Sequence, residues 1–124
     1  MINKKVLVIA SGLLGFLAVS LGAFGVHALK DKISAERLSI FQTGVIYHLI
    51  HAVIVLVIAF AGDNRFFKSA IFMITGIVLF SFSLYIYSIT QIKLFAMITP
   101  IGGVGFLVGW LMIIIEGLKT RKLL

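Results

Sequence analysis

The fold is decided by the stretch GAFGVHALKDKISAERLSIFQTGVIYHLIH at residues 22–51. This stretch is polar, whereas the rest of the chain consists almost entirely of apolar residues. All three histidines of the chain lie in it, together with five of its charged residues. Any chemical site is therefore expected here. The residues that carry this polarity are His27, Lys30, Asp31, Lys32, Glu36, Arg37, His48 and His51.

Composition on both sides of this stretch is that of a membrane protein. Of the 124 residues, 61% are hydrophobic and 12% are charged, and the mean hydropathy is +1.20. Soluble domains carry about 25% charged residues, and soluble monomers avoid the large apolar patches that this composition would expose. The chain has no cysteine, which excludes disulfides, thiolate metal ligands and a cysteine nucleophile. We expect one membrane domain over residues 1–124.

Four apolar segments are each long enough to cross the hydrocarbon core, which takes about 20 helical residues. The first is too long for the core of a signal peptide, about 7–15 residues, so we expect it to stay uncleaved. Tyr85 and Tyr87 are expected to anchor the third at the membrane interface. Thr99 and Pro100 suit the cap and the first position of the fourth. The predicted spans are residues 6–26, 44–62, 66–89 and 99–118.

Between the first two spans, Ser34 can cap a helix whose first turn contains Glu36. We expect a short helix at the membrane surface there. Small residues recur on one face of each span, as close helix packing in a membrane requires. The predicted fold is therefore all-α: an integral membrane four-helix bundle with a short interfacial helix between spans one and two.

The formal charge of +7 lies at the edges of the apolar spans, which favours contact with anionic lipid and not with nucleic acid. Lysine and arginine are enriched on cytoplasmic flanks. With four spans, both termini lie on the same side of the membrane, and that side has more lysines and arginines than the other. We therefore expect a plasma-membrane protein with both termini in the cytoplasm. That flank has Lys4, Lys5, Arg65, Lys68, Lys119, Arg121 and Lys122, against Lys30, Lys32, Arg37 and Lys93 on the other.

His48 and His51 are three residues apart and project from one helical face. Neutral imidazole is a common metal ligand, so His27, His48 and His51 are candidates for a metal or haem site. The alternative is a hydrogen bond between helices, which we favour. We expect His51 to be buried, neutral and bonded to another span, with Tyr47 or Ser83 as side-chain partners.

The sequence offers no combination of serine, histidine and acid for nucleophilic catalysis. Its acidic residues fall in loops or at membrane interfaces, where no serine and histidine can be paired with them. Glu116 is expected to pair with Lys119, three residues later. We therefore predict a protein that is not an enzyme and needs no cofactor.

Four segments in chain order resemble the signatures of the UPF0382 membrane proteins. This group is also called domain-of-unknown-function family 423 and is related to the transmembrane protein 256 group. The resemblance covers nearly the whole chain and implies a four-span membrane protein without an established activity. The segments are residues 22–30 with His27, 47–52 with Tyr47 and His51, 80–85 with Ser83 and Tyr85, and 98–103 followed by Gly109 and Trp110.

The leading interpretation is a non-enzymatic interaction or small-molecule and lipid-binding module. Its site would draw on His27, Tyr47, His51, Ser83 and Tyr85. Membrane lipid is the expected partner, and a homo-oligomer or another membrane protein is left open. Two alternatives remain. One is a metal or haem protein that uses the three histidines. The other is a small transporter with a polar passage among Ser20, His48, His51, Ser83 and Tyr87.

Overall fold

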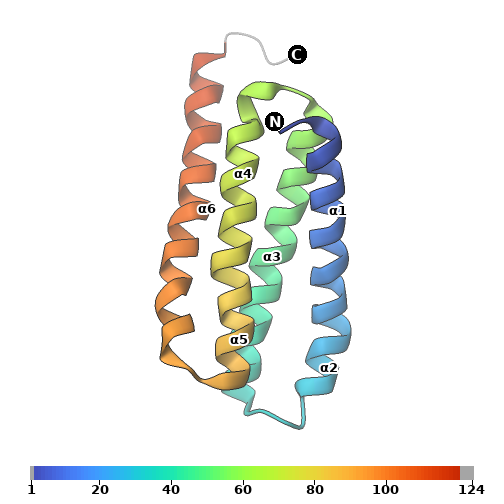
Figure 1. The fold of residues 1–124 in the computed structure, drawn as a ribbon, viewed down its shortest axis with the longest axis vertical. Helices are drawn as coiled ribbons and strands as arrows, with labels where there is room; N and C mark the ends of the chain where they lie inside the picture. Colours follow the sequence, from blue (N-terminus) through green and yellow to red (C-terminus); the bar gives the residue numbers. More distant parts are fainter. Residues whose placement is uncertain (1, 121–124) are drawn as a thin grey trace.

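The computed structural model describes residues 2–120, which form four long helical rods joined by short turns (Figure 1). Two of the rods contain a π-helical turn, where the hydrogen-bond spacing widens by one residue. In chain order the elements are α1 (Lys4–Ser20), η1 (Leu21–Gly25) and α2 (Val26–Leu29) in the first rod; α3 (Ala35–Ala61) in the second; η2 (Asn64–Phe66), α4 (Phe67–Gly76), η3 (Ile77–Ser81) and α5 (Phe82–Thr90) in the third; and α6 (Lys93–Lys119) in the fourth.

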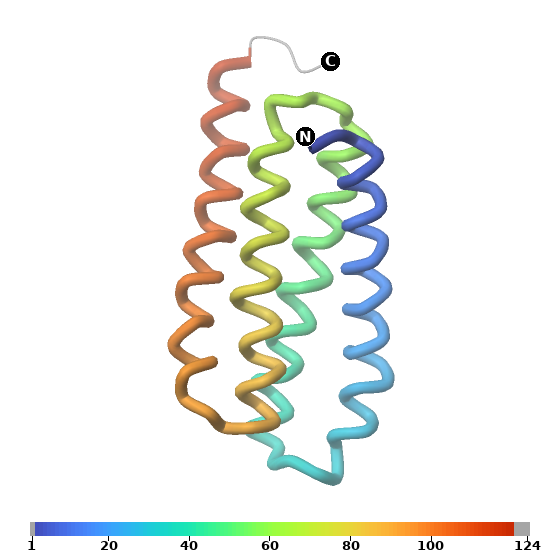
Figure 2. The backbone as a smooth tube through the Cα atoms, viewed as in Figure 1, coloured from blue at the N-terminus to red at the C-terminus, as the bar shows by residue number. Residues whose placement is uncertain are grey.

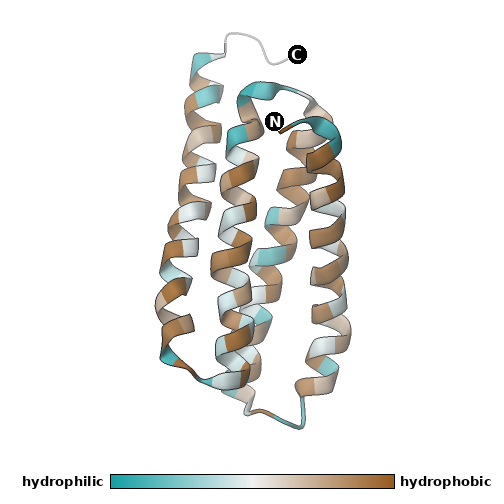
Figure 3. Ribbon diagram, in the orientation of Figure 1, coloured by the Kyte–Doolittle hydropathy of each residue, from teal (hydrophilic) through white to brown (hydrophobic). Residues whose placement is uncertain are grey.

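Each rod is long and apolar enough to cross a membrane, with lengths of 26 or 27 residues. At 1.5 Å per residue this is about 40 Å, more than the ~30 Å of hydrocarbon, so the rod ends reach the headgroup region. Hydrophilic residues are concentrated at the two ends of the molecule and hydrophobic ones along its length (Figure 3). The predicted all-α, four-span architecture is confirmed.

Neighbouring rods run in opposite directions, and the described N- and C-terminal residues lie at the same end (Figure 2). The central pair is α3 and the α4–η3–α5 rod. On one side α1 packs on α3, and on the other α6 packs on α4, η3 and α5. The outer rods are therefore more open to the surroundings than the central two.

The separate surface helix expected before the second span is not confirmed. Ser34 does cap a helix, since its hydroxyl accepts a hydrogen bond of 3.2 Å from the backbone N–H of Arg37. That helix is α3 itself, which continues unbroken to Ala61 and ends at Gly62, whose φ of 71° is left-handed. The helical hydrogen bonds continue without a break through residues 35–44. The expected surface helix and the second span are therefore one helix, α3.

The helix start predicted at Thr99 and Pro100 is wrong, because α6 begins at Lys93 and Pro100 lies inside it. Proline does suit a first helical turn. It is also tolerated inside membrane helices, where only one backbone hydrogen bond is lost and neighbouring groups compensate. The Thr99 hydroxyl bonds the Phe95 carbonyl at 3.1 Å, one turn earlier, and so belongs to the helix interior.

Glycine determines how closely the fourth rod approaches the third. A Cβ built on Gly102 would lie 2.2 Å from the backbone nitrogen of Phe80, so α6 touches the backbone of η3 here. A Cβ on Gly76 would meet the ring of Phe106 at 2.4 Å. By contrast, Gly15 in α1 has no neighbour within 4 Å, so the small-residue face expected on span one is only partly used in packing.

Candidate functional site

His51 is buried, with 5% of its surface exposed, and both ring nitrogens are engaged. Nδ1 lies 2.7 Å from the backbone carbonyl of Tyr47, and Nε2 lies 3.1 Å from the indole nitrogen of Trp110 in α6. A carbonyl only accepts and an indole N–H only donates. Nδ1 must therefore carry the proton and Nε2 the lone pair. His51 is a neutral imidazole bonded to another span, but its partner there is Trp110, and the expectation of a Tyr47 or Ser83 side-chain partner is wrong.

An aromatic cluster surrounds this imidazole. The Phe106 ring stacks on His51 with centroids 3.7 Å apart and planes 16° from parallel. Phe80 of η3 lies 4.6 Å from Tyr47 and 5.5 Å from Phe106, between centroids. Three rods thus contribute rings to one cluster, and its members lie near the middle of α3, η3 and α6.

Beside the cluster is a cavity of about 440 Å³, which we call the aromatic groove. It is open to the surface, and Val104 and Leu107 of α6 are exposed members of its lining. In a bilayer this opening faces the hydrocarbon. The polar residues of its lining are Tyr47, His51 and Trp110. The whole lining is Tyr47, His51, Phe80, Pro100, Gly103, Val104, Phe106, Leu107 and Trp110.

His48 lies outside the groove, fully buried between α3 and α5. Its Nδ1 is 2.8 Å from the hydroxyl of Tyr85, and its ring meets Phe82 edge-on, with centroids 5.5 Å apart. Tyr85 is itself 7% exposed, so the interface-anchor role predicted for it is wrong. It turns inward because a buried imidazole offers its hydroxyl a partner. The Nε2 atom of His48 has no hydrogen-bond partner among the described residues.

The structure does not bring the three histidines together. His27 is exposed on α2, and within residues 2–120 no group of three histidine, aspartate or glutamate side chains is placed to hold a metal ion. The metal or haem alternative therefore finds no assembled ligand set in this part of the chain. Ser83 does not contact His51 either, since its hydroxyl bonds the Phe80 carbonyl and Thr99, at 2.9 and 2.6 Å.

Arginines tie the ends of the rods together. Arg37, in the first turn of α3, donates from Nε to the carbonyl of Ser88 at 2.7 Å and from its terminal nitrogen to that of Ile89. These carbonyls belong to the last turn of α5, which has no helical donors left for them. The guanidinium also carries the charge that the negative end of a helix favours.

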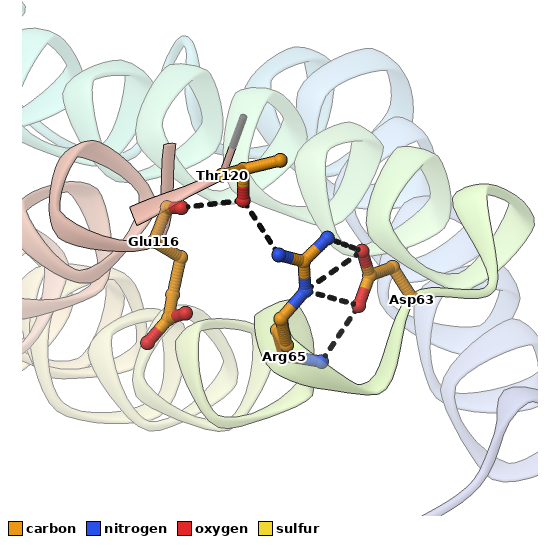
Figure 4. A network of polar contacts seen from close by, with 4 residues as sticks. All are labelled: Asp63, Arg65, Glu116 and Thr120. Atoms are coloured by element: carbon orange, nitrogen blue, oxygen red, sulfur yellow. Dashed lines mark hydrogen bonds and ion pairs between the residues drawn. The ribbon is translucent and has the colours of Figure 1, made fainter. Parts of the chain in front are cut away.

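At the opposite end, Arg65 binds both carboxylate oxygens of Asp63 and donates to the hydroxyl of Thr120 at 2.6 Å (Figure 4). That hydroxyl in turn donates to the Glu116 carbonyl at 2.8 Å. The hydrogen bonds from Arg65 hold the pKa of Asp63 below its ordinary value. The expected pair of Lys119 and Glu116 is present at 3.4 Å.

Trp110 is a residue of the groove whose contact with His51 was not predicted from the sequence. A signal was available, because Gly103, Phe106, Leu107 and Trp110 follow the spacing of one helical face. All four line the groove. The pattern marks a shared face of α6, but it does not indicate which helix that face meets.

Comparison with known proteins gives one consistent result. The model of the family described as "Protein of unknown function (DUF423)" matches residues 21–103. The chain is 44% identical to the UPF0382 membrane protein YwdK of Bacillus subtilis, over 93% of this chain and 98% of that protein. It is 35% identical to the UPF0382 inner membrane protein YgdD of Escherichia coli, over 97% and 95%. No solved structure matches.

Proposed function

This chain belongs to the UPF0382 membrane proteins, the DUF423 family, and from that premise we propose that it is a non-enzymatic plasma-membrane protein that binds an apolar molecule from the bilayer. The proposed binding site is the aromatic groove. The protein spans the membrane four times, and its ligand would enter sideways from the hydrocarbon.

The groove is the observation that carries this proposal. Its volume of about 440 Å³ is within the range of ligand pockets, roughly 300–1,000 Å³. Such pockets are mostly apolar and aromatic with a few placed polar groups, and rings of Phe80, Phe106 and Trp110 beside Tyr47 fit that description. Val104 and Leu107 are exposed members of the lining, so a lipid tail would reach the groove from the hydrocarbon without a passage through water.

Two further features support the rest of the proposal. The four acidic residues lie at helix ends or turns, away from the groove, which favours a binding protein over an enzyme. Basic residues at the rod ends would meet anionic headgroups, and their excess at the end shared by the termini favours a cytoplasmic location for both termini. The transporter alternative stays a prediction, with no observation here that favours it.

Trp110 provides the test, because it is the single tryptophan of the chain and lines the groove. Phospholipid with bromine in mid-chain quenches tryptophan only on contact. Titrated into the detergent-solubilised protein, it should quench Trp110 saturably at about one lipid per chain. The variant Gly103→Leu should weaken this binding at least about tenfold, since a Cβ on Gly103 has room, with its nearest neighbour at 3.8 Å, and a longer side chain fills the groove.

The matched control is Gly12→Leu, the same change on α1, where no atom lies within 4 Å. It should leave the titration unchanged. Quenching that rises without saturation, or that is equal in the two variants, would show that Trp110 contacts only bulk lipid and would refute a groove that binds.

A further inference from the structure

We propose that the occupant of the aromatic groove is a flat ring that carries a carbonyl group and an apolar tail, as in a lipid-soluble quinone, and that Tyr47 donates a hydrogen bond to that carbonyl. This inference rests on the proposed function, since it names the ligand class of the same groove. It goes further by requiring a polar atom on the ligand, at a defined place in the membrane.

Tyr47 is the first step of the argument. Its side chain is 43% exposed and lines the groove, while its hydroxyl has no hydrogen-bond partner within residues 2–120. Apart from the backbone bonds of α3, its one hydrogen bond within the described residues joins its carbonyl to the His51 ring. Hydrocarbon offers a hydroxyl nothing to bond, and an unpaired polar group there costs free energy. A ligand that brings an acceptor to Tyr47 would remove this cost.

Among the described residues, Tyr47 is also the one member of the lining whose polar side chain has no hydrogen-bond partner. The indole N–H of Trp110 is donated to His51, and the two ring nitrogens of His51 are both engaged. The lining therefore has one residue with an unused side-chain donor, Tyr47, and otherwise consists of rings, aliphatic side chains and Gly103. A ligand with a single acceptor on an otherwise apolar body matches this arrangement.

Depth separates a quinone from a phospholipid. Tyr47 lies about halfway along α3, so its side chain is near the middle of the membrane. The ester carbonyls of phospholipids lie at the edge of a hydrocarbon core that is about 30 Å thick, roughly 15 Å away. An acyl chain alone therefore brings no acceptor to Tyr47. A quinone is neutral and apolar enough to enter the core with its carbonyls.

Shape favours a ring as well. Phe80, Phe106 and Trp110 present aromatic surfaces to the groove. Aromatic rings attract other flat rings in offset or edge-on contact beyond the effect of buried area. A planar ring would therefore gain more from these walls than a flexible chain of equal volume.

The experiment uses the full-length protein in detergent with two probes of equal tail length, decyl-1,4-benzoquinone and decylbenzene. Their affinities are measured by isothermal titration calorimetry, because a benzoquinone itself quenches tryptophan and would hide the displacement of the brominated phospholipid. The quinone should bind at least about five times more tightly than decylbenzene. Tyr47→Phe keeps the ring and removes the hydroxyl, so it should weaken quinone binding about five- to tenfold, the worth of one hydrogen bond, and leave decylbenzene unchanged.

Tyr87→Phe is the matched control, because Tyr87 is not part of the groove lining, and it should change neither probe. Equal affinity of the two probes, or quinone binding that is unaffected by Tyr47→Phe, would overturn the carbonyl inference and leave the lipid-binding groove standing. Failure of the proposed function itself is distinguishable, since the brominated phospholipid would then show no saturable quenching of Trp110.

Discussion

The indole N–H of Trp110 in α6 donates a 3.1 Å hydrogen bond to Nε2 of His51 in α3. This bond links two rods that are separated in sequence by the whole of the third. It also fixes the imidazole as a neutral acceptor at that nitrogen, while the Tyr47 carbonyl holds the other. Both residues line the aromatic groove, and the bond between them is the basis of the first prediction.

Replacement of His51 by leucine should lower the free energy of unfolding in detergent by about 1 kcal/mol or less, the typical worth of an interhelical hydrogen bond in membranes. The measurement is thermal or denaturant unfolding of His51→Leu, Trp110→Phe and the double variant. The two single losses should sum to more than the double loss, because each removes the same bond. Strict additivity would show that the bond contributes nothing to stability.

Gly102→Ala should be much more damaging than Gly103→Ala. The Cβ at position 102 would lie 2.2 Å from a backbone nitrogen that cannot move aside alone, so α6 must separate from η3. We expect a loss of about 2 kcal/mol or more in unfolding free energy, as for overpacked cores. At position 103 the nearest atom is 3.8 Å away, and alanine should be neutral or stabilising. Equal stability of the two variants would contradict the close approach.

Arg37→Gln should destabilise the protein by about 1 kcal/mol, because it removes the charged donor to the Ser88 and Ile89 carbonyls. The end of α5 should fray, and its amides should exchange hydrogen faster. Lys32→Gln is the control at the same end of the molecule, where the side chain is exposed and makes no hydrogen bond within the described chain. If both variants exchange alike, the cap on α5 has no energetic role.

The ion pair of Asp63 and Arg65 predicts that the stability of the protein depends on pH. The pKa of Asp63 is lowered in the folded protein by hydrogen bonds from Arg65, so its contribution is complete above the ordinary pKa of 3.8. It is lost as pH falls through the lower folded value. Wild type should therefore be more stable than Asp63→Asn at neutral pH, and the difference in melting temperature should shrink below pH 4. A difference that stays constant with pH would rule out this linkage.

Orientation can be tested in a chain that has no cysteine of its own. Lys32 lies in the turn between α2 and α3, and Asn64 is the first residue of η2, at the opposite end of the rods. With cytoplasmic termini, cysteine at position 32 should react with an impermeant maleimide in intact cells, and cysteine at position 64 only after permeabilisation. The reverse pattern would place the termini outside, and labelling of both from outside would refute the four-span arrangement in cells.

The sequence by itself determined the membrane class, the number of spans and the burial of His51. These follow from local properties: runs of apolar residues long enough for the hydrocarbon core, and the cost of an ionisable group within it. The pair of Lys119 and Glu116 was also predictable, because residues three apart on a helix are neighbours whatever the tertiary fold.

Helix ends were less predictable. Ser34 and Pro100 both carry the signals of a helix start, yet Ser34 opens a long helix in place of a short surface one and Pro100 lies inside α6. In a membrane every backbone group must be paired within the chain, so helices continue past signals that would end them in water.

Only the tertiary structure decided the partners. The sequence places His48 and His51 on one face of α3, but it does not show that His48 meets Tyr85 of α5 and His51 meets Trp110 of α6. That depends on the rotation and depth of each rod, which are set by contacts such as Gly102 against the backbone of Phe80. The groove exists because of those rotations, since its walls come from three rods that approach one another only in the folded protein.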